Sequence, residues 1–101
     1  MNITKNDNIK SIRDIGLCLQ TMIRNRFNKK TKVIQTDGSK YPSLYISFYK
    51  NHTWQFYIQD KVSYYIVFLL KNDKVVRKEI VRHNEYISTF HGKMMYFFRL
   101  I

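Results

Sequence analysis

The chain has 101 residues, of which 45% are hydrophobic and 16% aromatic, and it carries 18 Lys and Arg against 7 Asp and Glu. This length suits one domain with one modest core over residues 1–101, and the apolar content excludes a disordered chain. The net charge of +11 favours phosphate-bearing partners, DNA or RNA, because each neutralised phosphate releases counterions.

The first predicted element is a helix over residues about 8–27. Apolar residues recur at helical spacing from Ile9 to Ile23 and form one stripe. Gly16 disfavours helix at its centre, so a break at that point is one alternative. The candidate N-cap residues are Asn6, Asp7 and Asn8.

Residues 43–49 and 53–59 are predicted strands in which apolar and polar residues alternate regularly. Successive side chains of a strand point to opposite faces, so one face belongs to the core and the other to the surface. The expected core residues are Leu44, Ile46, Phe48, Trp54, Phe56 and Ile58. The expected surface aromatics are Tyr45, Tyr49 and Tyr57, with Tyr65 of the following strand as a further candidate.

Five other segments are also predicted strands: 31–36, 62–70, 74–82, 86–90 and 94–100. The Asp37-Gly38 dipeptide is a turn signal after the first of them. Residues 94–100 are hydrophobic and would aggregate as an unpaired edge, so we expect this strand to be buried, paired within the sheet or used in a homodimer.

Together these elements predict an α+β fold. One N-terminal helix packs on a mostly antiparallel meander sheet of five to seven strands, because short connections make sequential strands neighbours. A winged-helix fold, with residues 67–82 as the wing, is an alternative, but that fold requires more helices than the pattern provides.

Three groups of residues are candidates for binding nucleic acid. Unpaired bases stack on aromatic rings, which suits the tyrosines Tyr45, Tyr49 and Tyr57. A basic cluster at the end of the helix comprises Arg24, Arg26, Lys29, Lys30 and Lys32. A basic hairpin comprises Lys71, Lys74, Arg77, Lys78 and Arg82. Each group also has a structural alternative: cross-strand pairing, helix C-terminal capping and a solvated edge strand, respectively.

The predicted function is that of a small, basic, non-enzymatic protein that binds nucleic acid as an accessory factor of a bacterial plasmid or phage. The abundance of Lys, Asn, Ile and Tyr suits an AT-rich genome of that kind. One alternative is a protein–protein module that inhibits or recruits a host nucleic-acid enzyme. A second is a small ribonuclease toxin that uses His52, His83 or His91 with Glu85 and Tyr86.

No cofactor or metal site is expected, because the sequence has no glycine-rich phosphate loop and no zinc-type Cys/His spacing. One cysteine, Cys18, cannot form an internal disulfide, which favours a reducing cytoplasm. No apolar stretch has the length of a membrane span, so no membrane partner is expected.

Overall fold

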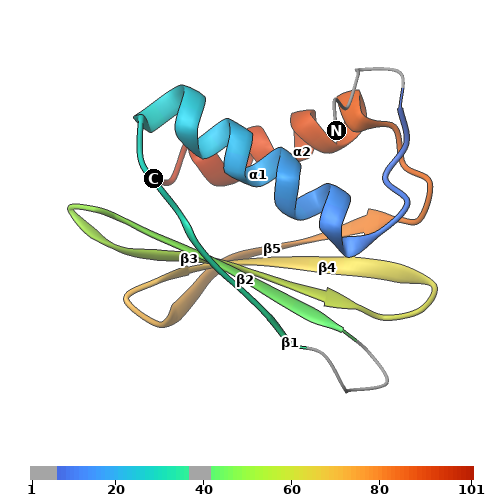
Figure 1. The fold of residues 1–101 in the computed structure, drawn as a ribbon, viewed down its shortest axis with the longest axis horizontal. Helices are drawn as coiled ribbons and strands as arrows, with labels where there is room; N and C mark the ends of the chain where they lie inside the picture. Colours follow the sequence, from blue (N-terminus) through green and yellow to red (C-terminus); the bar gives the residue numbers. More distant parts are fainter. Residues whose placement is uncertain (1–6, 37–41) are drawn as a thin grey trace.

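The computed structural model describes residues 7–36 and 42–101. The elements in chain order are α1 (Ile12–Phe27), β1 (Lys32–Thr36), β2 (Ser43–Lys50), β3 (His52–Asp60), β4 (Tyr64–Lys71), β5 (Lys74–Arg82) and α2 (Ile87–Phe98). The strands form one antiparallel sheet in the order β1-β2-β3-β4-β5, and both helices lie on the same side of it (Figure 1). The predicted α+β meander is confirmed.

Helix α1 begins later than the sequence predicts. Its N-cap is Ser11, whose Oγ accepts a hydrogen bond from the backbone N–H of Asp14 at 3.4 Å. Residue Ile9 is not helical, because its backbone N–H and C=O bond instead to Glu85 and Asn84. Of the predicted N-cap residues, Asp7 and Asn8 lie before Ile9 and do not cap α1, and Asn6 lies outside the described residues. The predicted end at Phe27 is confirmed.

The helix continues through Gly16 without a break. A Cβ atom at this position would lie 2.5 Å from Cδ2 of Leu44, a buried side chain of β2. The glycine therefore allows the helix and the sheet to approach closely, and this packing outweighs its low helix propensity.

The predicted alternation in β2 and β3 is confirmed, since the six expected core residues all lie between the sheet and the helices. Tyr65 is a correction to the surface group. It belongs to the same face of β4 as Val67 and Leu69 and is only 2% exposed, so it is a core residue. The face of the sheet turned away from α1 and α2 is called the open face below.

The last two predicted strands, 86–90 and 94–100, are wrong, because this segment forms α2. Its buried residues are Ile87, Phe90, Met94, Phe97 and Phe98, a spacing that places them on one helical face. A run as apolar as MMYFF has no polar positions to mark either period, so periodicity alone does not separate strand from helix. Of the three expectations for this segment, burial is confirmed, while pairing within the sheet and a homodimer through a C-terminal strand both required a strand that does not form.

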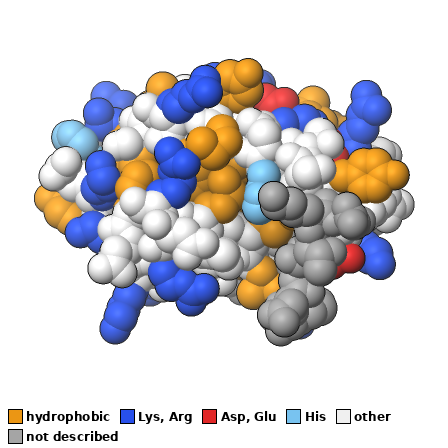
Figure 2. All heavy atoms as spheres, turned by 90° about the horizontal axis from the view of Figure 1, so that it is seen from above, with side chains coloured by type: hydrophobic (Ala, Val, Ile, Leu, Met, Phe, Trp, Pro, Cys, Tyr) orange, Lys and Arg blue, Asp and Glu red, His pale blue; other side chains and the backbone are white. Residues whose placement is uncertain are grey.

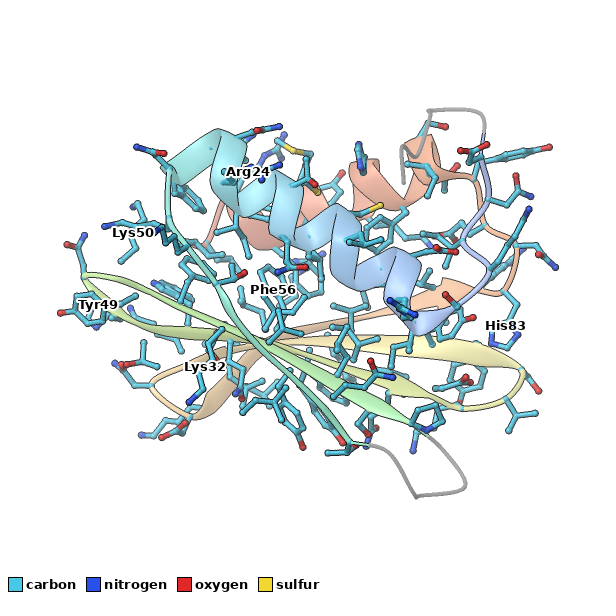
Figure 3. All side chains as sticks on the ribbon, viewed as in Figure 1. Arg24, Lys32, Tyr49, Lys50, Phe56 and His83 are labelled. Carbon is cyan, nitrogen blue, oxygen red and sulfur yellow. The ribbon has the colours of Figure 1, made fainter. Side chains whose placement is uncertain are left out.

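The core closes where both helices meet the centre of the sheet. Phe56 of β3 lies beneath them, with its ring centroid 6.0 Å from that of Phe97 and 5.5 Å from that of Phe98 (Figure 3). Phe27 of α1 contacts the ring of Phe48 at 6.0 Å and that of Phe98 at 5.8 Å. None of the helices in the described ranges is long and apolar enough to cross a membrane.

Cys18 lies in this core and should be chemically inert in the folded protein. Burial, with a smaller contribution from the Asp14 carboxylate, raises the pKa of its thiol to about 11. We expect iodoacetamide to alkylate the native protein far more slowly than the urea-unfolded protein, because the thiolate is the nucleophile. Mass spectrometry of timed samples would measure this. Equal alkylation rates would contradict the buried position.

The same pKa shift makes the stability of the protein depend on pH. Because folding favours the neutral thiol of Cys18, the free energy of unfolding should fall as the pH rises from about 9 toward about 11.

Candidate nucleic-acid interface

Basic side chains from four separate segments of the chain meet at one end of the molecule. We call this the basic end: it comprises the end of α1, the loop that follows it, the start of β1, the β2–β3 and β4–β5 turns, and the residues after α2. Contacts join these segments, since Lys50 Nζ lies 5.1 Å from the ring centroid of Phe27 and 3.3 Å from the backbone oxygen of Ile101. The basic residues of this end are Arg24, Arg26, Lys29, Lys30, Lys32, Lys50, Lys71, Lys74 and Arg99.

The acidic side chains lie mostly at the opposite end. Asp14 begins α1, Asp60 ends β3, and Asp7 and Glu85 lie in segments that pair with each other there. Asp73 is the one acidic side chain of the described residues at the basic end. Figure 2, which looks onto the helices, shows its red acidic side chains on the right half, away from the basic end on the left. The charge is therefore polarised along the sheet.

The turns at the basic end are held together by hydrogen bonds. The backbone N–H of Asn72 donates to the Thr53 carbonyl at 2.8 Å, and the Thr53 N–H donates to Asn72 Oδ1 at 3.1 Å. Asn51, Asn72 and Asp73 adopt positive φ, which tight turns require. This network fixes the backbone from which the lysines of both turns project, so little order has to be gained when a ligand binds.

All five residues of the predicted basic cluster are exposed at this end, but the predicted basic hairpin is divided. Lys71 and Lys74 lie at the basic end, and Lys71 Nζ is 5.6 Å from the ring centroid of Trp54. Lys78 and Arg82 project from the open face, opposite Phe68 and Tyr64.

Arg77 projects to the other side of the sheet, toward α2. Its guanidinium lies 5.2 Å from the ring centroid of Tyr96 and 5.7 Å from that of Phe97. Its Nε is buried, so this arginine packs α2 onto the sheet.

The predicted tyrosines are likewise divided. Tyr49 lies at the basic end, next to the β2–β3 turn, and is 65% exposed (Figure 3). Tyr45 and Tyr57 lie in the middle of the open face and stack on each other, with ring centroids 4.4 Å apart and ring planes 11° from parallel. Phe68 continues this row on the far side of Tyr57, at 5.7 Å. The ring faces of the row are thus turned toward neighbouring strands rather than toward solvent.

Hydrogen bonds join the hydroxyl groups of this tyrosine pair to polar neighbours. Gln59 Nε2 donates to the Tyr57 oxygen at 2.6 Å, and the Ser43 hydroxyl lies 3.5 Å from it. Partial burial acts to raise the pKa of Tyr57, but these bonds, the bond with Tyr45 and the nearby Lys61 charge lower it overall. The bond with Tyr57, followed by burial, raises the pKa of Tyr45. These contacts stabilise the sheet, as cross-strand pairs commonly do.

Two of the three histidines lie at opposite ends of the molecule. His52 lies in the turn at the basic end, where its Nδ1 is 3.2 Å from Asn72 Nδ2. His83 lies at the opposite end, with its Nε2 3.6 Å from an oxygen of Asp60 (Figure 3). Among residues 7–36 and 42–101, no group of three or more His, Cys, Asp or Glu is placed to hold a metal ion.

Two residues of the basic end, Lys50 and Arg99, were missed by the sequence reasoning. Lys50 stands alone in a turn of the sequence, and Arg99 fell at the end of a segment predicted as a strand. Only the packing of α1 and α2 beside the β2–β3 turn brings both into the cluster. Comparisons of the chain with protein-family models, with curated proteins and with solved structures found no match in any of the three.

Proposed function

We propose that this protein is a non-enzymatic nucleic-acid-binding protein that holds phosphates of DNA or RNA at the basic end. The observation that carries the proposal is the convergence of cations from four segments onto one end of the sheet, with most carboxylates at the other. Helix capping accounts for cations near the end of α1, but not for those of the two turns. A concentrated positive field of this kind attracts a polyanion and orients it toward one end.

Tyr49 supports an unpaired strand as the preferred ligand. Its ring is largely exposed beside the lysines, which is the combination that single-stranded nucleic acids use: cations for the backbone and an aromatic face for a base. Tyr45 and Tyr57 are not part of this proposal, because their ring faces contact each other and Phe68. Arg77 is excluded as well, because it packs against α2.

The biological setting that we propose is an accessory role in a bacterial plasmid or phage. The support is compositional: a small chain rich in Lys, Asn, Ile and Tyr suits an AT-rich genome of that kind.

The proposal is tested by fluorescence anisotropy of labelled oligonucleotides, single-stranded and duplex, DNA and RNA, at several salt concentrations. We expect binding whose logarithm falls linearly with the logarithm of salt, with a slope of about −0.7 per phosphate contact for a single strand. The single-stranded forms should bind more tightly than the duplexes. Absence of binding at low salt would refute the proposed function.

Replacing Tyr49 with alanine should weaken binding of the single strand about 5-fold to 150-fold, because one stacked base contributes roughly 1–3 kcal/mol. The salt slope should stay unchanged, since no cation is lost. Tyr86→Ala is the matched control, because Tyr86 is 61% exposed but lies at the opposite end of the sheet. Equal effects of the two substitutions would remove base stacking from the proposal and leave the phosphate contacts.

A further inference from the structure

The open face carries an apolar and aromatic band that crosses the whole sheet. Direct cross-strand pairing aligns one row of side chains over the five strands: Ile34, Tyr45, Tyr57, Phe68 and Lys78. The adjacent row ends in Ile66 and Ile80, the latter 53% exposed. Ile34 at the other edge is 48% exposed. Contiguous apolar surface of this kind commonly marks an interaction site.

Among the described strand residues, only cations and neutral side chains project from this face. Lys32 lies at the β1 edge, and Lys78 and Arg82 lie at the β5 edge. The strand carboxylates point the other way: Asp60 pairs with Tyr65, and Glu79 with Val67, both of which are core residues. Within the described part of the chain, the band is therefore bounded by positive charge on two sides.

An anchor point lies at the β5 edge. Ile66 and Ile80 line a shallow hollow of about 300 Å³ together with Lys78 and Glu79. Glu79 pairs with the core residue Val67, so its carboxylate belongs to the other face of the sheet. An apolar side chain can enter between the two isoleucines while a carboxylate beside it reaches the Lys78 ammonium. Buried apolar anchors surrounded by a charged rim are typical of protein interfaces.

We propose that the open face docks an acidic amphipathic helix of a protein partner. A helix of this chemistry brings an apolar stripe to the band and carboxylates to Lys32, Lys78 and Arg82. The band spans four interstrand spacings, roughly 19 Å, which corresponds to about 13 helical residues. The sheet would then be covered by helices on both faces, an arrangement that sheets commonly adopt.

Two other occupants fit this face less well. A second copy of the chain would bring the same cations and no matching carboxylates, so like charges would meet across the interface. A nucleic acid would need exposed ring faces for its bases, but Tyr45, Tyr57 and Phe68 present their edges. An acidic helix supplies the carboxylates that a second copy lacks, and it does not require exposed ring faces.

The probe is a synthetic amphipathic peptide of about 14 residues with leucines on one face and glutamates on the other. Its binding to the ¹⁵N-labelled protein is followed by NMR. A scrambled peptide of equal composition is the control for attraction to the overall positive charge. We expect the amphipathic peptide to bind at least 10-fold more tightly and to shift amides of the open-face residues of β1, β4 and β5. Equal binding of both peptides, or shifts confined to the basic end, would overturn the proposal.

Ile80→Asp places a carboxylate in the band and should weaken binding of the amphipathic peptide at least 10-fold. Val62→Asp is the matched control, because Val62 is 60% exposed in the β3–β4 turn, where its φ of 73° suits aspartate. An unchanged affinity in Ile80→Asp would overturn the proposal. So would a wild-type dimer in analytical ultracentrifugation that Ile80→Asp dissociates. Oligonucleotide binding at the basic end should be preserved in this variant, which separates this surface from the one in the proposed function.

Discussion

Replacing Lys29, Lys30 and Lys32 together by glutamine is expected to weaken oligonucleotide binding roughly 100-fold at about 0.1 M salt. These exposed lysines lie in the connection from α1 to β1 and at the first residue of β1, all within the basic end. Each phosphate contact that is lost should reduce the magnitude of the logarithmic salt slope by about 0.7 for a single strand. Three lost contacts should therefore reduce it by about 2, which salt-dependent anisotropy can measure directly.

The matched control removes the same charge from the other end of the molecule. Lys10, Arg13 and Lys61 are exposed and lie near the start of α1 or in the β3–β4 turn, so their replacement by glutamine lowers the net charge equally. If overall charge alone attracts the nucleic acid, both triple variants will lose affinity equally. That result would contradict a localised interface. Loss confined to the first variant would support it. Neither variant should lose much stability, because exposed substitutions usually change it by less than about 0.5 kcal/mol.

Phe97→Ala is expected to destabilise the fold by about 3–5 kcal/mol, the usual cost of truncating a large buried aromatic. The Phe97 side chain is fully buried in α2 and lies against Phe56 and the Arg77 guanidinium. Its loss would leave a cavity between the second helix and the sheet and would remove one of the contacts that hold Arg77. Urea denaturation followed by circular dichroism would measure the change in the free energy of unfolding.

Tyr96→Ala provides the comparison for this substitution. Tyr96 precedes Phe97 in the chain and is 52% exposed, with the guanidiniums of Arg77 and Arg99 each 5.2 Å from its ring centroid. Its removal should cost about 1 kcal/mol or less, since exposed cation–π contacts are weak. Similar losses for both variants would contradict the packing of α2 onto the sheet.

The alternation of residues 43–59 shows why much of the sheet could be predicted from sequence. A strand that is buried on one face must alternate, and the six expected core residues follow this rule without exception. The end of α1 at Phe27 could likewise be predicted, because Asn28 and the lysines after it end the apolar stripe. Local chemistry was sufficient at these places.

The C-terminal segment and Tyr65 show where local chemistry was insufficient. Residues 94–98 are apolar at almost every position, and only their packing on the sheet beside α1 selects a helix. Tyr65 has a polar tip but occupies a core position in β4, which the strand parity of β4 against β3 decides. The tyrosine by itself does not show which face of the sheet it occupies.

By itself, the sequence determined the antiparallel meander, the faces of β2 and β3 and an excess of positive charge, because these depend on local periodicity and composition. Only the tertiary structure decided how that charge is distributed. It brought Lys50 and Arg99 to the cluster at the end of α1, turned Arg77 away from solvent and stacked Tyr45 on Tyr57. Such placements depend on contacts between residues far apart in the chain, whose energies no local pattern contains.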